Sequence, residues 1–253
     1  MQYQVVDPIG ARVTDLSLDE VDGGDMARLE KLLAEAGVVV IPDQNVDDRA
    51  FLAFLERFGE LMFTKGEMPL AGYPDLNVIS NVGRTTPPRS TFHVDTTYVS
   101  QPPRYTALRA VHVPQEGGHT QFSNQYAAYD TLPDEIREDL AGRLVTHVVT
   151  GVDPGDDAET SAVHPIFLAH PLSGRTALYL SAAARCAAIS GKTSEETAEV
   201  IAYLITHSTR EDNVLRHAWS AGDVVMWDNR VVMHRADHSG VVGDRVMHRG
   251  MVR

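Results

Sequence analysis

A histidine and an aspartate two residues apart, His93 and Asp95, are the first residues of this chain whose types and spacing indicate chemistry. Side chains alternate between two faces along an extended segment, so residues at positions i and i+2 share a face. An imidazole and a carboxylate on one face offer two ligands to a metal ion. A second histidine would complete the two-His-one-carboxylate set that leaves three positions open on Fe(II). Since His-x-Asp also occurs by chance, the prediction depends on a third ligand.

His234 is the candidate third ligand. It lies in the run from Gly222 to Ala236, where polar residues are set into an apolar, strand-like pattern. A jelly roll brings strands that are distant in sequence side by side, so the long separation from His93 does not exclude this assignment.

Two arginines, Arg245 and Arg249, follow His234 on the last expected strand, four residues apart and therefore on one face. Burying two guanidinium groups beside a metal costs free energy unless anions neutralise them, and a guanidinium binds a carboxylate through two parallel hydrogen bonds. These residues indicate a metal next to a carboxylate-binding pocket. The alternative is that both arginines lie on the surface and pair with the many acidic residues of the chain.

Composition restricts the class of protein. The chain has 253 residues, 43% of them hydrophobic, and 35 acidic against 22 basic residues, which gives a formal net charge of -13. The acidic balance argues against nucleic acid, whose binding requires clustered Lys and Arg. No apolar run approaches the length that spans a bilayer, and the first residues lack a signal-peptide pattern, so no membrane partner is expected. Cys186 is the only cysteine, which favours a reducing, cytoplasmic location.

The elements that must position these residues are expected to be strands flanked by helices. Apolar periodicity and capping residues predict helices at 25–36, 49–58, 124–132, 133–144 and 193–207. Apolar runs between turn signals predict strands at 38–41, 76–80, 105–113, 119–122, 164–171, 177–180, 223–227, 231–234 and 245–252. Residues 1–23 are turn-rich, and residues 153–161 are predicted to form a loop. Without a repeat or linker, the pattern favours one domain over 1–253, mainly β with flanking helices.

Residues 60–91 are rich in glycine and proline and lead directly into His93. A connection of this length in a compact domain is often functional, so we expect an active-site lid at 60–91; the alternative is an ordinary surface loop. Lys65 and Arg89 lie in this segment. We expect them to assist Arg249 in binding an anionic substrate, unless their side chains face solvent.

The motifs, taken together, resemble one family. They run in order from about residue 30 to the end of the chain: His93-x-Asp95, Pro102-Pro103-Arg104-Tyr105, Gly117-Gly118-His119-Thr120, Ala127-Ala128-Tyr129-Asp130-x-Leu132-Pro133, His164-Pro165, His170-Pro171-x-Ser173-Gly174, Trp227-Asp228-Asn229-Arg230, His234, Arg245 and Arg249. This pattern resembles the taurine dioxygenase family, which includes 2,4-dichlorophenoxyacetate dioxygenase and consists of Fe(II)- and 2-oxoglutarate-dependent oxygenases.

The resemblance implies a double-stranded β-helix, or jelly roll, that binds Fe(II) through His93, Asp95 and His234. It implies that Arg245 and Thr120 hold the distal carboxylate of 2-oxoglutarate, that O2 is the second cosubstrate, and that Arg249 contacts the substrate. The implied reaction is hydroxylation of a small organic anion with release of succinate and CO2, and no catalytic residue is implied beyond the metal ligands. Family members are usually dimers or higher oligomers, so a homo-oligomer is expected.

Three departures from the family pattern bear on the substrate. Phe92 stands where the family usually has Trp, and His119 stands where it usually has Asp; neither is a metal ligand. The segment from Met62 to Glu67 lacks the His and Tyr with which the taurine enzyme holds taurine. A carboxylate is therefore expected rather than taurine, and Arg104-Tyr105 with the stretch from Met233 to Ala236 is closer to the aryloxyalkanoate branch.

Other functions remain open from the sequence. The same cofactors support desaturation or oxidative cleavage in place of hydroxylation, and a family member could retain the fold as a non-catalytic anion-binding protein. A zinc hydrolase would use a general acid or base beside a metal-bound water, but it would leave the paired arginines unexplained. Asp95 argues against the halogenating relatives, which lack this carboxylate.

Overall fold

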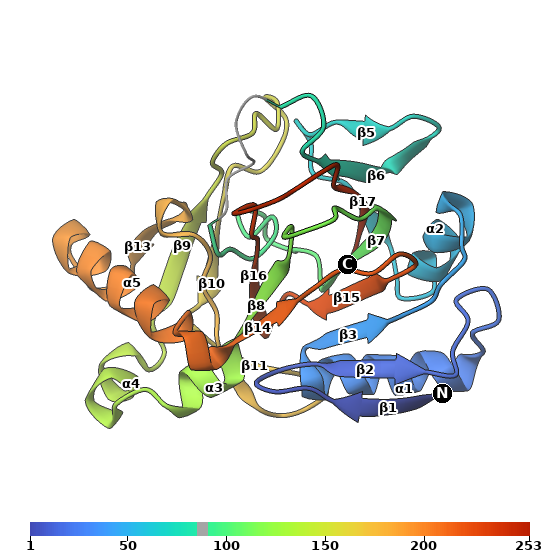
Figure 1. Ribbon diagram of the computed structural model, residues 1–253. Coiled ribbons are helices and arrows are strands. Elements are labelled where there is room, and N and C mark those ends of the chain that lie inside the picture. Colours follow the sequence, from blue (N-terminus) through green and yellow to red (C-terminus); the bar gives the residue numbers. More distant parts are fainter. Residues whose placement is uncertain (85–90) are drawn as a thin grey trace.

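The computed structural model describes residues 1–84 and 91–253 (Figure 1). Within these residues the largest sheet has nine strands, and a smaller sheet has three. The large sheet has the order β1 (Gln2–Val5), β2 (Ala11–Thr14), β3 (Val38–Ile41), β15 (Val224–Asp228), β7 (Tyr105–His112), β17 (Val246–Val252), β6 (Tyr73–Ser80) and β5 (Pro69–Leu70), with β4 (Leu61–Met62) also paired to β17. The small sheet has the order β14 (Val214–His217), β8 (Thr120–Asn124) and β16 (Val232–Ala236).

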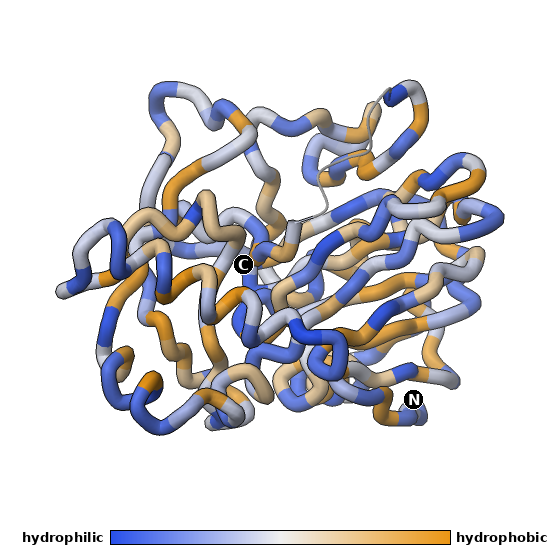
Figure 2. Tube along the Cα trace, turned by 60° about the vertical axis from the view of Figure 1, so that its left-hand side comes forward, coloured by the Kyte–Doolittle hydropathy of each residue, from blue (hydrophilic) through white to orange (hydrophobic). Residues whose placement is uncertain are grey.

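The two sheets share an apolar core. Phe122 of β8, Trp227 of β15 and Met247 of β17 are all fully buried in one cluster. In Figure 2, orange and blue stretches alternate along the chain, and many outer turns are blue. Burying the inner faces of two sheets against each other is the main source of stability in such an architecture, because the hydrophobic effect scales with the apolar area removed from water.

Two helices cover the other face of the large sheet. They are α1 (Gly23–Ala36) and α2 (Asp48–Glu56), and Asp22 and Asp47 cap them by accepting hydrogen bonds from backbone N–H groups. Such a cap satisfies donors that have no partner within the helix. Gly37, with φ of 70°, ends α1 in a conformation that favours glycine. Both predicted helices are confirmed.

A second group of elements packs beside the small sheet, on the left of Figure 1. It contains α3 (Gln125–Asp130), α4 (Asp134–Leu140), α5 (Ser194–Ser208) and the short helices η1 (Ala183–Arg185) and η2 (Glu211–Asn213). It also contains a sheet of β10 (Ser161–Pro165), β9 (Leu144–Val148) and β13 (Cys186–Ile189), and the hairpin of β11 (Phe167–Ala169) with β12 (Thr176–Leu178). The Thr193–Glu196 capping box that starts α5 is confirmed.

Three sequence-based expectations were wrong in part. The turn-rich residues 1–23 contain the hairpin of β1 and β2, whose strands are only four residues long, with β1 fully exposed. The predicted helix at 133–144 ends at Leu140, and β9 begins at Leu144, because Gly142 with φ of 72° redirects the chain. The predicted strand at 76–80 is confirmed as the end of the eight-residue β6, but β4 and β5, which also pair in the large sheet, were not predicted.

No helix in the described part of the chain is long and apolar enough to cross a membrane.

Candidate metal centre

The backbone brings His93 beside His234. The two residues form an isolated antiparallel bridge, with His93 N donating to His234 O at 3.0 Å and His234 N donating to His93 O at 2.9 Å. His234 lies on β16, so the segment around His93 extends the small sheet by one residue pair. Asp95 follows two residues later and is buried between the sheets, where Thr106 of β7 contacts it.

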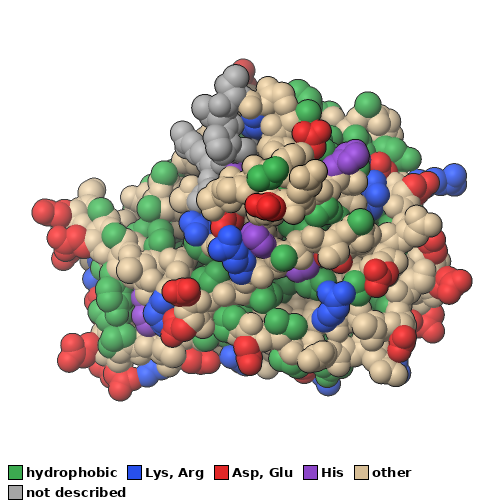
Figure 3. Space-filling model, viewed as in Figure 1, with side chains coloured by type: hydrophobic (Ala, Val, Ile, Leu, Met, Phe, Trp, Pro, Cys, Tyr) green, Lys and Arg blue, Asp and Glu red, His purple; other side chains and the backbone are tan. Residues whose placement is uncertain are grey.

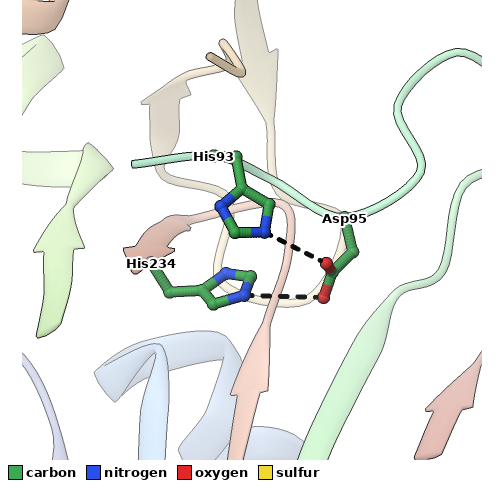
Figure 4. A group of neighbouring side chains, drawn as sticks. All are labelled: His93, Asp95 and His234. Atoms are coloured by element: carbon green, nitrogen blue, oxygen red, sulfur yellow. Dashed lines mark ion pairs between the residues drawn. The ribbon is translucent and has the colours of Figure 1, made fainter. Parts of the chain in front are cut away.

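The three side chains converge on one point (Figure 4). His93 Nε2 lies 3.5 Å from Asp95 Oδ1, and His234 Nε2 lies 3.7 Å from Asp95 Oδ2. One ligand atom from each residue lies within 4.8 Å of the others, as binding to a common metal ion requires. His93 is partly exposed, whereas Asp95 and His234 are buried, so solvent reaches the group at His93.

Neighbouring groups orient His93 and Asp95 for metal binding. His93 Nδ1 lies 2.9 Å from the Thr91 carbonyl oxygen, and donation to that oxygen leaves the lone pair of Nε2 free. Asp95 Oδ2 accepts a hydrogen bond of 2.8 Å from Thr106 Oγ1, which accepts one from Asn229 Nδ2. Thr106 and Asn229 were not predicted as site residues, although Asn229 lies in the polar run that drew attention to His234.

The electrostatics favour the protonation states that a metal site needs. Burial raises the pKa of the Asp95 carboxyl, but the neighbouring His234, Arg249 and His93 outweigh this effect and hold the pKa well below its usual value. Burial lowers the pKa of His234 to about 3, although Asp95 opposes this shift. At neutral pH the site therefore presents one carboxylate and a neutral His234 imidazole, which fits a divalent cation.

Arg245 and Thr120 form an anion site close to the metal group. Arg245 is 1% exposed; its Nε donates to Gly118 O at 2.8 Å, and its Nη2 donates to Thr120 Oγ1 at 3.2 Å. Among the described residues, its Nη1 is buried without a hydrogen-bond partner and no carboxylate forms an ion pair with it. Burial lowers the pKa of Arg245 to about 10. A buried cation without a counter-ion is costly, so this position fits a ligand carboxylate.

Arg249 is also buried, and it contacts the metal group directly. Its Nη1 lies 3.5 Å from Asp95 Oδ1, and its Nη2 donates to Asn77 Oδ1 at 3.3 Å and to Glu67 Oε2. Glu67 and Asn77 were not predicted as site residues. In the sequence, only its polar side chain within a strand could have indicated Asn77, and no local pattern indicated that Glu67 belongs to the site.

The two other residues predicted to bind the substrate, Lys65 and Arg89, are not seen beside Arg249 in the described part of the chain. Lys65 is exposed and lines a cavity of about 170 Å³ with Thr96, Tyr98 and Arg253, and none of the described contacts joins it to Arg249. Arg89 lies within 85–90, outside the described residues. On the face shown in Figure 3, Lys, Arg and His side chains gather near the middle of the molecule, and acidic side chains lie mostly toward its edges.

The chain is similar to known proteins over nearly its whole length. The model of the taurine catabolism dioxygenase TauD, TfdA family matches residues 2–251. The alpha-ketoglutarate-dependent 2,4-dichlorophenoxyacetate dioxygenase of Cupriavidus pinatubonensis is 32% identical over 267 aligned positions, covering 94% of this chain and 92% of the relative. The alpha-ketoglutarate-dependent sulfate ester dioxygenase of Pseudomonas putida is 29% identical, with 92% of this chain and 83% of the relative covered.

Solved structures show the same fold. The taurine dioxygenase of Burkholderia xenovorans superposes with a TM-score of 0.86 at 29% identity, covering 99% of this chain and 90% of the other. The expected jelly roll is thereby confirmed, since this likeness includes both sheets and the helices around them.

Proposed function

Because the chain belongs to the taurine catabolism dioxygenase TauD, TfdA family, we propose that it is a non-haem Fe(II)- and 2-oxoglutarate-dependent dioxygenase that hydroxylates a small organic anion and releases succinate and CO2. The observation that carries the proposal is Arg245, a buried cation without an acidic partner among the described residues, beside Thr120. In the register of β8 with β16, Thr120 pairs with Ala236 and Phe122 pairs with His234. The anion site therefore lies two residues along the same strands from the metal group.

Each residue of the site has a defined task in this proposal. His93, Asp95 and His234 hold Fe(II), and Arg245 with Thr120 holds the distal carboxylate of 2-oxoglutarate. When bound, Fe(II) and 2-oxoglutarate supply the activation of O2 and the oxidation of the substrate, coupled to decarboxylation of the 2-oxo acid. Thr120 Oγ1 also accepts a hydrogen bond of 3.0 Å from Trp219 Nε1, which leaves the Thr120 hydroxyl proton free to donate to a ligand.

The substrate class follows from Arg249 and from the relatives. Arg249 is a second buried guanidinium, and it lies within 3.5 Å of Asp95. The relatives are named for 2,4-dichlorophenoxyacetate, a sulfate ester and phenoxypropionate, all organic anions. We therefore assign Arg249 to the anionic group of the substrate, with Lys65 and Arg89 as further candidates from the preceding segment.

Succinate formation from 2-oxoglutarate tests the function directly. The protein is supplied with Fe(II), O2 and a panel of aryloxy acids, sulfate esters and sulfonates, together with neutral analogues of each. We expect anion-stimulated succinate formation that an Arg249→Gln variant loses. Equal turnover of the neutral analogues, with kinetics unchanged in Arg249→Gln, would refute the assignment of an anionic substrate. Absence of Fe(II)-dependent succinate from every compound would refute the dioxygenase.

We further propose a cytoplasmic homo-oligomer. The single cysteine, Cys186, is buried, and burial raises the pKa of its thiol to about 11, as suits a structural thiol in a reducing compartment. Light scattering on the purified chain measures the oligomeric state, and a monomer at micromolar concentration would contradict the proposal.

A further inference from the structure

The turn at residues 64–67, which carries Glu67, packs against the metal site. Glu67 N donates to Thr64 O at 3.2 Å, and Thr64 Oγ1 lies 3.1 Å from Thr96 Oγ1, one residue after Asp95. Gly66 has φ of 87°, and a Cβ at this position would lie 2.5 Å from the Asp153 carbonyl oxygen. The turn is therefore wedged between the metal-binding segment and the 153 loop, and it presents Glu67 to Arg249 from a fixed backbone.

Arg249 is only partly satisfied by its neighbours. Its Nη2 donates hydrogen bonds to both Glu67 and Asn77. Its Nε is buried and has no partner among the described residues. Asn77 faces Arg249 across the pair of strands β6 and β17, and its Nδ2 is likewise buried without a described partner. With Arg249 paired to Glu67, the Nε of Arg249 and the Nδ2 of Asn77 therefore both lack an acceptor among the described residues. Buried unpaired donors are costly, and an anionic ligand group would satisfy them.

The charge balance at Arg249 also favours a ligand that carries a positive group. Glu67 neutralises Arg249, and Asp95 belongs to the metal, so a simple monoanion that enters beside Glu67 adds an unbalanced negative charge to a buried site. The side chain of Glu67 is 27% exposed, so a ligand can reach it from solvent. A ligand with a positive group near its anionic group would leave the charge balanced and give Glu67 a second partner.

We propose that Glu67, Asn77 and Arg249 form a clamp for dipolar substrates, in which Arg249 and Asn77 bind the anionic group and Glu67 binds an ammonium or similar cationic donor. The proposal rests on the proposed function and narrows its substrate class. Glu67 is then the residue that determines specificity for such molecules over simple monoanions.

Matched ligand pairs test the clamp. The protein is loaded with Mn(II) and N-oxalylglycine, which cannot turn over, and calorimetry measures the binding of taurine against ethanesulfonate and of a series of amino acids against the corresponding des-amino acids. In the wild type, we expect at least one ammonium-bearing member to bind about tenfold more tightly than its partner, equivalent to ~1.4 kcal/mol. Glu67→Gln should abolish this preference. Asn77→Leu should weaken both members and keep their ratio.

Glu60→Gln is the matched control, because Glu60 is exposed and pairs with Arg253 rather than Arg249, so both affinities should stay unchanged. The clamp is overturned if no pair shows the preference in the wild type, or if Glu67→Gln retains it. It is also overturned if Glu67→Gln mainly tightens the des-amino acids, since Glu67 would then only compete with the substrate for Arg249. Fe(II)-dependent succinate formation, measured separately, reports whether the proposed function itself holds.

Discussion

At the scale of single residues, His93 and Asp95 are arranged for metal binding by groups outside the triad. The carbonyl of Thr91 fixes the His93 tautomer, and Thr106 fixes the Asp95 carboxylate. Removing a ligand should therefore remove the metal without disturbing the backbone, because the bridge between His93 and His234 is made by main-chain atoms.

We predict that His93→Ala and His234→Ala each abolish 2-oxoglutarate-dependent turnover and weaken metal binding. Equilibrium dialysis of Mn(II) against each variant measures the binding, and succinate formation measures the turnover. His112→Ala, which removes an exposed histidine, is the control and should bind Mn(II) like the wild type. Full activity in either ligand variant would show that the assignment is wrong.

Arg245 supports a second prediction at this scale. Charge-assisted hydrogen bonds contribute roughly 1.5–3 kcal/mol each, and ~1.4 kcal/mol corresponds to a factor of ten. Arg245→Ala should raise the apparent constant for 2-oxoglutarate at least tenfold. The stabilisation of the metal-loaded protein by 2-oxoglutarate, measured as a shift in Tm, should fall in parallel. An unchanged constant would remove Arg245 from the cosubstrate site.

At the scale of elements, the turn before β8 sets the position of Arg245. Gly117 and Gly118 both have positive φ, and Thr120 starts the strand two residues later. A Cβ on Gly118 would lie 2.8 Å from Pro114 Cγ and 3.0 Å from Arg245 Cδ. The side chain of Arg245 therefore lies directly over the glycine, and the turn and the cosubstrate site depend on each other.

Gly118→Ala should accordingly raise the apparent constant for 2-oxoglutarate, because the new methyl group displaces Arg245, while the affinity for metal stays close to that of the wild type. Gly142→Ala is the matched control: its φ is 72°, but no heavy atom lies within 4 Å of its added Cβ. The control should lose stability from backbone strain alone. Equal effects of both variants on the 2-oxoglutarate constant would contradict the proposed contact.

At the scale of the whole molecule, buried histidines tie folding stability to pH. Burial lowers the pKa of His147 to about 3, with further lowering by His164 and Arg185, while its ordinary value is 6.5. Its Nδ1 lies 3.0 Å from Thr97 Oγ1, so it also helps to hold the segment that follows Asp95. Between about pH 3 and 6.5 the unfolded chain binds a proton here that the folded chain does not, so stability rises with pH across this window.

We predict that the free energy of unfolding of the metal-free protein falls as pH drops from 6.5 toward 5, with His147 contributing up to ~1.4 kcal/mol per pH unit. Urea titrations in the presence of a chelator measure this slope. His147→Asn should be less stable at pH 8 but lose stability less steeply on acidification. His112→Asn, at an exposed position, should keep the slope of the wild type. Parallel slopes in wild type and His147→Asn would contradict the prediction.

Features that depend on short-range patterns were predictable from the sequence. The spacing of His93 and Asp95, the caps of α1, α2 and α5, and the positive-φ glycines after helices follow from neighbours a few residues away. The order of the motifs also identified the family, because each motif is local although the site is not.

The tertiary structure alone decided how distant groups meet. The sequence contains Glu67, Asn77 and Arg249 at unremarkable positions, and only the pairing of β6 with β17 and the wedged turn at Gly66 bring them together. The strand β1 was not predicted because it has only four residues and all of them are exposed, whereas the predicted strand at 76–80 is the end of the longer β6. Nor could the sequence show that Arg245 lacks an acidic partner among the described residues, because whether a charge is paired depends on long-range packing.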